Sequence, residues 1–493
     1  MQSLWRSNAR TIETDPAPPS DVVDDIVVGA GLTGLVTALL LAREGRRVLV
    51  LEARDIGAVT TGNSTAKVSL LQGAQLQKIR ARTYPAIVRA YVDANRAGQD
   101  WLLDYAASRG IAVQRRDAVS YASHPEGFRV VEKEYRIARD SGLDARLSWN
   151  LDLPFDTYGA VVLRGQAQLD PLDVLACLVE DIRALGGTVL ERARVTGVAA
   201  SRPVVVSSTA GDFEAQRAHL TTGTPILDRG LYFAKLSATR SYAASFRGVE
   251  HIPDGMYLSV DDPKRSIRAA PDADGELLLV GGGGHGVGRA VSPRAIVDDL
   301  LDWTRARFPG AEPTHEWSAQ DYSTPHGVPF VGWLPRGRGR IFLATGYDKW
   351  GMTNAAAAAL TLTGDLLGKT PPWAKILHRR ATLPPAIAAS IGENAAVAAW
   401  AARGWFTALT AGAPPAQVPE GEGVLGHRGL HPQGVSRVGD TVCAVSAVCP
   451  HLGGVVSWND AEKSWDCPLH GSRFSASGEN LEGPATRPLR RVN

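Results

Sequence analysis

One stretch near the start of the chain decides the fold: Asp25-Ile-Val-Val-Gly29-Ala-Gly31-Leu-Thr-Gly34. It begins as a short apolar strand and turns at its glycines. The apolar residues that follow predict a helix over Leu32 to Glu44. A second strand over Arg47–Leu51 ends at Glu52. Strand, helix and strand in this order make one βαβ unit, which predicts an α/β fold with a parallel sheet.

The same glycines suit the pyrophosphate of a dinucleotide. A G-x-G-x-x-G string alone is weak evidence, but this one lies between a strand and a helix, and Glu52 follows eighteen residues after Gly34. Glycines permit the tight turn and the close approach of phosphate to a helix N-terminus, while Glu52 can accept both ribose hydroxyls. An acidic residue at the end of the second strand favours a ribose with a free 2′-hydroxyl, and therefore FAD or NAD over NADP. The alternative is a bare glycine turn.

The C-terminal end carries a second pattern, Cys449-Pro-His451-Leu-Gly-Gly454 and Cys467-Pro-Leu-His470-Gly-Ser472, with fifteen residues between His451 and Cys467. Each loop contributes one Cys and one His. A structural zinc site usually pairs Cys with Cys and His with His. A Rieske 2Fe–2S cluster instead needs two thiolates on one iron and two imidazoles on the other. The spacing therefore predicts such a cluster, with zinc or coincidence as the alternatives.

Besides the two ligand candidates, the chain has two further cysteines, Cys177 and Cys443. The uneven placement of the four cysteines does not predict a disulfide framework. Cys443 lies six residues before Cys449 in a strand-like run. We interpret it as a small buried residue rather than as a ligand.

Composition excludes some partners. Charged residues make up 21% of the chain and its formal net charge is +2, so electrostatics give no reason to expect nucleic acid or an anionic membrane. The apolar run Gly31 to Ala42 is ended by Arg43 well short of a membrane span, and no signal-peptide run precedes it. We expect a soluble, cytoplasmic protein with no membrane partner.

At 493 residues the chain should contain two or three domains. Its middle section predicts amphipathic helices and β-rich stretches; the helices are Ile87–Ser108, Pro171–Leu185 and Pro293–Phe308, and the strands are Val204–Ser208, Ala238–Phe246 and Glu276–Val280. Prolines between Ala411 and Gly423 indicate a linker. Only short strand-like pieces follow it, as in a small all-β domain.

Later segments favour FAD over NAD. The Gly/Thr/Ser loop Gly57–Lys67 could wrap a second phosphate and reach an isoalloxazine ring. Near the far end, the strand Ile341–Thr345 leads through Gly346 into an alanine-rich helix, whose N-terminus could stabilise negative charge on a flavin. A second G-x-G-x-x-G, Gly281–Gly286, lacks a prompt helix and a second acidic strand end, so we interpret it as a substrate-domain loop.

These segments resemble the D-amino-acid oxidase/glycine oxidase superfamily of FAD enzymes over about residues 22 to 370. The segments that carry the resemblance are Val28–Gly34, Thr61–Lys67, Thr221–Gly223, Trp317–Asp321, Thr324–Gly332 and Thr345–Asn354. The whole chain resembles a bacterial group in which such a flavoprotein carries a C-terminal Rieske domain.

The resemblance implies a Rossmann-like FAD domain interleaved with an antiparallel-sheet substrate domain, followed by a small all-β Rieske domain. The implied FAD domain comprises 22–75, 151–230 and 315–370, and the implied substrate domain comprises 76–150 and 231–314. A helical segment and linker over 371–416 would join them to a Rieske domain over 417–493. The implied cofactors are FAD and a 2Fe–2S cluster.

The resemblance also nominates site residues. The cofactor-binding candidates are Gly29, Gly31, Thr33, Gly34, Glu52, Ala53, Thr61, Thr65, Ala66, Lys67, Val195, Gly223, Gly346, Lys349, Trp350, Gly351, Met352 and Thr353. The catalytic candidates are Lys349, Tyr347, Tyr242 and His285, and the metal ligands are Cys449, His451, Cys467 and His470. Lys349 could activate oxygen or bind a carboxylate, or be an ordinary surface lysine. Thr353 stands where sarcosine-oxidase-like members carry a carboxylate-binding lysine, which argues against a simple amino-acid substrate.

Around the cluster, Gly454 and Leu469 occupy the places of two cysteines that form a disulfide in respiratory-complex Rieske proteins. Ser472 matches a serine that hydrogen-bonds a cluster sulfur, whereas Phe474 replaces a tyrosine of high-potential members. Fewer hydrogen bonds to sulfur favour the oxidised cluster, so we expect a potential in the lower part of the roughly −150 to +300 mV Rieske range.

Flavin and cluster on one chain imply a relay. We expect a dehydrogenase that oxidises a small-molecule substrate at a C–N or activated C–H bond and passes single electrons to an external one-electron carrier. One alternative is an electron-transfer component that takes electrons from a reduced carrier and supplies a partner protein. Another is a redox sensor without turnover.

Overall fold

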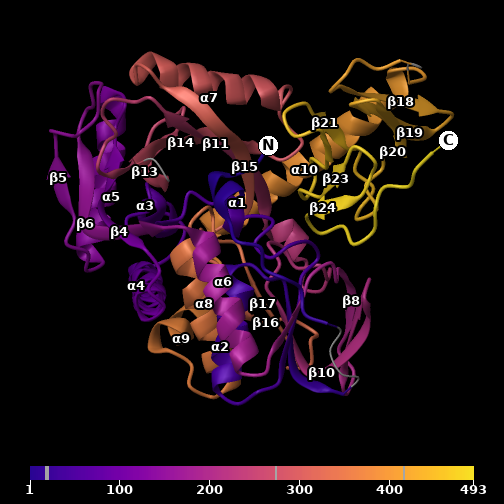
Figure 1. Ribbon diagram of the computed structural model, residues 1–493, viewed down its shortest axis with the longest axis horizontal. Helices are drawn as coiled ribbons and strands as arrows, with labels where there is room; N and C mark the ends of the chain where they lie inside the picture. Colours follow the sequence, from indigo (N-terminus) through magenta and orange to yellow (C-terminus); the bar gives the residue numbers. More distant parts are fainter. Residues whose placement is uncertain (17–20, 273–274, 415–416, 493) are drawn as a thin grey trace.

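The computed structural model describes residues 1–16, 21–272, 275–414 and 417–492. Two large sheets make up most of the molecule, and the C-terminal domain, yellow in Figure 1, sits at one side near β11 and β15. The predicted α/β fold class with a C-terminal all-β domain is confirmed.

The first sheet has the strand order β16-β17-β10-β1-β2-β7, with β8 and β9 attached to β10. β1 lies between β2 and β10 and pairs with both in parallel, as the βαβ pattern predicts. The strands of this sheet are β1 (Val23–Val28), β2 (Val48–Leu51), β7 (Thr188–Leu190), β8 (Val195–Ala199), β9 (Val204–Ser208), β10 (Gly211–Leu220), β16 (Phe330–Trp333) and β17 (Ile341–Thr345).

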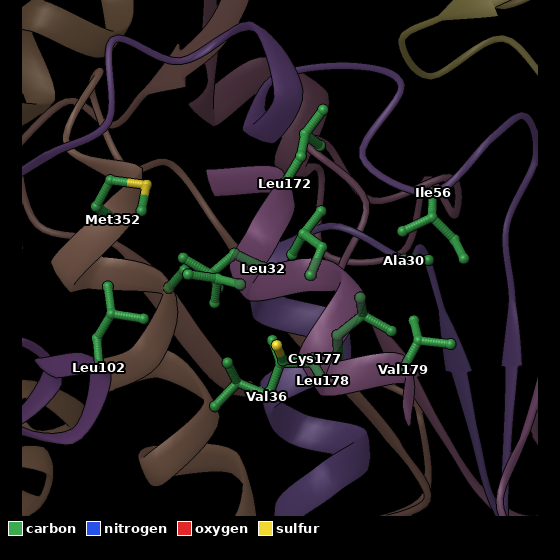
Figure 2. Close-up of a cluster of buried hydrophobic side chains, with 14 of the residues drawn as sticks. Ala30, Leu32, Val36, Ile56, Leu102, Leu172, Cys177, Leu178, Val179 and Met352 are labelled. Atoms are coloured by element: carbon green, nitrogen blue, oxygen red, sulfur yellow. The ribbon is translucent and has the colours of Figure 1, made fainter. Parts of the chain in front are cut away.

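Helices cover this sheet and form the main hydrophobic core. α2 (Leu32–Arg43) follows the glycine turn and packs against α6 (Pro171–Ala184) and α8 (Gly351–Leu366). Figure 2 shows Leu32 and Val36 of α2 gathered with Leu178 of α6 and other apolar side chains. Cys177 belongs to this same cluster and is buried.

The second sheet is mostly antiparallel and has the order β15-β11-β14-β13-β12-β4-β6-β3, with β5 beside β6. Its strands are β3 (Lys67–Val68), β4 (Val113–Tyr121), β5 (Arg146–Ser148), β6 (Ala160–Leu169), β11 (Ser237–Arg247), β12 (Met256–Ser259), β13 (Arg265–Asp272), β14 (Gly275–Gly286) and β15 (Glu312–Ser323). Two of these strands, β3 and β6, lie within the ranges expected for the FAD domain, and β15 straddles the expected boundary between residues 314 and 315. The domain boundaries that the resemblance implies stay a prediction.

The structure of the second glycine-rich string also differs from the loop that its sequence predicts. Gly281–Gly286 is the end of β14, hydrogen-bonded to β11, and not a loop. Glycines can continue a strand where another backbone or a side chain approaches closely. Here Ile296 crowds the position of Gly283, and Lys349 crowds that of Gly284.

The remaining helices pack around the sheets. They are α1 (Leu4–Asn8), α3 (Gln75–Arg80), α4 (Pro85–Ser108), α5 (Phe128–Asp140), α7 (Pro293–Arg307), α9 (Pro372–His378) and α10 (Pro384–Thr410), with the 3₁₀ turns η1 (Thr61–Asn63), η2 (Pro125–Gly127) and η3 (Tyr232–Lys235). Figure 1 shows α10 running beside the C-terminal domain, to which its Trp405 donates a hydrogen bond at Gly453.

The C-terminal domain consists of two small antiparallel sheets. One contains β18 (Gly423–Arg428), β19 (His431–Val438) and β20 (Thr441–Ser446), and the other contains β21 (Ser457–Asn459), β22 (Ser464–Asp466), β23 (Arg473–Ser475) and β24 (Asn480–Glu482). The predicted linker over Ala411–Gly423 includes two residues, 415 and 416, that lie outside the described residues.

Candidate functional site

A cavity of about 1010 Å³ lies where the carboxyl ends of β1, β2, β10 and β17 face the second sheet. Its wall combines the glycine turn, the Thr60–Lys67 loop, the end of β14 and the turn after β17. Leu481, Glu482 and Gly483 of the C-terminal domain complete it. Parallel α/β sheets bind ligands at this edge, and the volume is sufficient for a dinucleotide and a small substrate.

The glycine turn has the geometry that a pyrophosphate cradle needs. Gly29 adopts a φ of +104°, which disfavours residues with a side chain. A Cβ atom at Gly34 would lie 1.9 Å from the carbonyl oxygen of Gly29. The turn therefore stays tight, and the N-terminus of α2 begins at the cavity wall.

Glu52 ends β2 and faces the same turn. Its carboxylate accepts hydrogen bonds from the backbone N–H of Ala30 at 2.8 Å and of Arg54 at 2.9 Å. Burial raises the pKa of Glu52, and these backbone bonds act against that rise. An acceptor fixed across the glycine turn fits the ribose of a bound dinucleotide.

Most of the predicted cofactor residues line this cavity, but Gly34, Ala66 and Thr353 do not. Gly34 packs against Gly29, and Ala66 is fully buried. Thr353 faces away into a buried polar network, where its hydroxyl donates to Asn95 Oδ1 at 2.6 Å. Thr353 therefore lies outside the part of the wall that a substrate could reach.

Lys349 lies at the cavity on a turn with unusual backbone geometry. Asp348 and Lys349 have φ values of +52° and +72°. The partly buried Asp321 carboxylate holds this turn by accepting a hydrogen bond from the Lys349 backbone N–H. The Lys349 ammonium donates to Ser241 Oγ at 2.6 Å, and burial lowers the pKa of Lys349. Sparsely populated backbone conformations of this kind concentrate at functional sites.

The other catalytic candidates also line the cavity. Tyr242 and His285 stack with ring centroids 5.7 Å apart, and Tyr242 Oη has no hydrogen-bond partner among the described residues. Burial lowers the pKa of His285 and raises that of Tyr242. Tyr347 differs, because its hydroxyl is hydrogen-bonded to Thr33 Oγ1 at 2.9 Å.

Lys67 is buried in the wall between the two sheets. Its ammonium donates to the Tyr257 carbonyl at 2.9 Å and to Ser266 Oγ at 2.6 Å. Burial lowers the pKa of Lys67 to about 7, and the nearby Arg268 adds to this effect. Lys67 can therefore change charge near neutral pH.

The four Cys and His ligands lie on two tight loops. Cys449 N–H donates to the Gly454 carbonyl and Cys467 N–H donates to the Ser472 carbonyl, both at 2.8 Å. A hydrogen bond between the two thiols lowers the pKa of Cys449. The imidazole centroids of His451 and His470 are 5.2 Å apart.

These residues fit a 2Fe–2S cluster. His470 Nδ1 is buried with no hydrogen-bond partner among the described residues, which leaves it free to bind a metal. Within the described part of the chain, no three His, Cys, Asp or Glu side chains converge as a single-ion site would require. A Rieske cluster takes only two side chains at each iron.

The imidazole edges face the flavin-binding part of the chain. His451 Nε2 lies 3.0 Å from Asp228 Oδ1. The ring of Phe233 meets both imidazoles edge-on, with centroids 5.7 Å from His451 and 5.2 Å from His470. Neither Asp228 nor Phe233 is predictable from a local motif, because the contacts span more than two hundred residues of sequence.

A buried ion network fixes the C-terminal domain to the second sheet. Arg240 of β11 donates to Glu482 at 2.9 Å and binds Glu462 through two nitrogen atoms. Arg473 also contacts Glu462, at 3.1 Å. Burial alone would raise the pKa of Glu462, but Arg240 and Arg473 lower it to about 2.

The sequence matches two families. Residues 24–364 match the FAD dependent oxidoreductase family, and residues 411–493 match the Rieske [2Fe-2S] domain. The Rieske 2Fe-2S iron-sulfur protein YhfW of Bacillus subtilis (strain 168) is 30% identical over 503 residues, covering 100% of this chain and 97% of that protein.

Solved structures share the fold of the flavin-binding part. Glycine oxidase from Geobacillus kaustophilus matches with a TM-score of 0.59 and 19% identity, covering 71% of this chain and 95% of its own. L-proline dehydrogenase from P. horikoshii matches with a TM-score of 0.58 and 14% identity, covering 72% and 95%.

Fold, cavity and cluster loops thus define a flavin-dependent redox enzyme with a second, iron–sulfur centre. The chain belongs to the FAD-dependent oxidoreductase family of the D-amino-acid oxidase type and carries a C-terminal Rieske 2Fe–2S domain. Its cofactors are FAD and the 2Fe–2S cluster. No helix in the described ranges is long and apolar enough to cross a membrane.

Proposed function

We propose that this oxidoreductase is a dehydrogenase that acts on a small amine, amino acid or imino acid at a C–N or adjacent C–H bond and delivers single electrons to an external carrier. One observation carries the proposal: the flavin cavity and the cluster loops share a wall. Glu482 and Gly483 line the cavity, and Gly483 packs directly on Gly471 and Ser472.

FAD, when bound, supplies the two-electron chemistry with a substrate and can release electrons one at a time, which matches a cluster that carries one. The protein must then hold the substrate and keep water away from it. Lys349 and Ser241 present an ammonium and a hydroxyl to the cavity, a pair suited to a carboxylate.

Two comparisons support a carbon–nitrogen substrate. Glycine oxidase and L-proline dehydrogenase share the fold of the flavin-binding part. In this chain Lys349 is a cavity lysine placed to bind a substrate carboxylate, whereas Thr353 faces away from the cavity. We expect a substrate whose carboxylate reaches Lys349.

The direct test is anaerobic mixing of the holoprotein with a panel of amines, amino acids and imino acids while flavin absorbance is recorded. We expect bleaching by at least one carboxylate-bearing member, and a weaker apparent affinity for it in Lys349→Met than in wild type. Bleaching by NADH and by none of the panel would favour the electron-transfer component instead. Rapid reduction of dioxygen with the cluster bypassed would contradict a dehydrogenase.

A further inference from the structure

Gln320 of β15 contacts both a loop of the flavin cavity and a loop of the cluster site. Its backbone carbonyl accepts a hydrogen bond from Thr60 Oγ1, in the Gly57–Lys67 loop, at 2.7 Å. Its side-chain amide nitrogen donates to the Tyr322 hydroxyl at 2.9 Å and to the Gly471 carbonyl at 2.7 Å. The side chain is buried and lines the cavity. Gln320 therefore joins the flavin-binding part to a cluster loop.

The orientation of this amide is fixed by its partners. The Gly471 carbonyl can only accept a hydrogen bond, and Arg240 can only donate one. Gln320 Nε2 faces Gly471, and Gln320 Oε1 faces Arg240 Nη1 at 3.4 Å. If the amide were flipped, Oε1 would face the Gly471 carbonyl oxygen and Nε2 would face the Arg240 guanidinium, and neither pair could form a hydrogen bond. The Gln320 side chain therefore has one stable orientation.

The bridge begins at the cavity and ends at Gly471, the residue after the cluster ligand His470. Tyr322 is buried and lines the cavity, where its ring packs against Gly223. Gly471 directly follows His470, and its N–H donates to the Cys467 carbonyl at 3.2 Å. A continuous series of hydrogen bonds and covalent bonds thus connects the cavity wall with the cluster loop.

Two other crossings between the two parts are less direct. Asp228 contacts His451 through a carboxylate that is 60% exposed, so water reaches it. Gly483 contacts Gly471 and Ser472 only by packing. Electronic coupling falls more steeply across packing gaps than along hydrogen bonds, and a buried hydrogen-bond series is also held more rigidly than an exposed one.

We propose that Tyr322 and Gln320 form the route by which electrons cross between the flavin cavity and the cluster. This inference rests on the proposed function. In each crossing the reduced flavin loses one electron and releases its proton into the cavity. The oxidised cluster gains that electron, and one of its two ferric ions becomes ferrous. A one-electron carrier protein then reoxidises the cluster before the second crossing.

The experiment uses holoprotein containing FAD and cluster, without substrate. A light flash with a photoreductant reduces the flavin anaerobically, and cluster reduction is followed by absorbance and low-temperature EPR. Gln320→Met keeps the side-chain length and removes both donated bonds. Tyr322→Phe removes only the hydroxyl. Ser457→Ala is the matched control, because it deletes another 2.7 Å hydrogen bond between the two parts, to the Gly288 carbonyl, that involves neither Gln320 nor Tyr322.

We expect Gln320→Met to slow electron transfer by about tenfold and Tyr322→Phe to slow it by a smaller factor. Midpoint potentials and the EPR spectrum of the cluster should match wild type in both variants, and Ser457→Ala should transfer at the wild-type rate. If Gln320→Met does not fold, the electron-transfer rate of Tyr322→Phe alone tests the route.

If Gln320→Met and Tyr322→Phe fold and transfer electrons at the wild-type rate, the proposed route is wrong. It is also wrong if changes in the measured midpoint potentials fully explain a slower transfer. An equal slowing in Ser457→Ala would also overturn it, because domain contact in general would then be responsible. If wild type itself moves no electron from flavin to cluster, the proposed function fails first, and the two failures are therefore distinguishable.

Discussion

The guanidinium of Arg240 lies 2.9 Å from the carboxylate of Glu482, and this contact joins the second sheet to the Rieske domain inside the protein. The Arg240 side chain is 3% exposed and that of Glu482 is 10% exposed. Since Glu482 also lines the flavin cavity, the ion network that holds the domain in place forms part of the site wall.

Removing Arg240 should therefore destabilise the protein strongly. Arg240→Ala leaves the buried carboxylates of Glu462 and Glu482 without a partner on β11, so we expect a loss of about 3–5 kcal/mol in the free energy of unfolding. Urea unfolding of the holoprotein measures it. Arg247→Ala is the matched control on the same strand, because its pair with Glu312 is exposed and should contribute less than about 1 kcal/mol. Equal losses in the two variants would contradict the importance of the buried network.

The same network predicts a pH dependence. Arg240 and Arg473 outweigh the effect of burial and lower the pKa of Glu462 to about 2, below its ordinary value of about 4.3. The stabilisation is therefore complete above the ordinary value and is lost as pH falls from about 4.3 towards 2. Glu462→Gln should be less stable than wild type at neutral pH, and the difference should shrink over this acidic interval. A difference that stays constant with pH would show that Glu462 does not titrate there.

The βαβ unit and the cluster loops are predictable because their geometry is local. Glycine spacing sets the turn after β1, and each Cys and His pair lies within four residues. The contacts of Asp228 with His451 and of Gln320 with Gly471 are not predictable in this way, because they depend on how two parts that lie far apart in the sequence meet. The end of β14 was wrongly expected to be a loop, since its glycines obscure a strand whose pairing with β11 is set by tertiary contacts.

Cysteine substitutions distinguish the cluster ligands from the cysteines that do not bind the cluster. Cys467→Ala should abolish the 2Fe–2S absorbance and EPR signal. FAD should remain bound, because Cys467 does not line the flavin cavity. Cys443→Ala should retain full iron and sulfide content, since Cys443 lies on β20 outside the two ligand loops. Iron and sulfide analysis measures both. Loss of the cluster from Cys443→Ala would make Cys443 a ligand.

Hydrogen bonding to the cluster predicts its potential. Ser472 contacts the Cys449 thiol, whereas the fully buried Phe474 offers no hydroxyl. We expect a wild-type potential in the lower part of the roughly −150 to +300 mV range, a further decrease in Ser472→Ala and an increase in Phe474→Tyr.

Redox titration followed by EPR measures these three potentials. Ser475→Ala is the control on the same strand, because its hydroxyl pairs with Ser477. A wild-type value near the top of the range would contradict the prediction.

Rapid freeze-quench EPR tests the central claim most directly. The holoprotein is mixed anaerobically with a compound that bleaches its flavin, and samples are frozen during the first turnover. A relay predicts that the signal of the reduced 2Fe–2S cluster appears as flavin is reduced and grows at least as fast as turnover with a one-electron acceptor. A flavin that is fully reduced while the cluster stays oxidised and EPR-silent, at potentials that permit transfer, would contradict the relay.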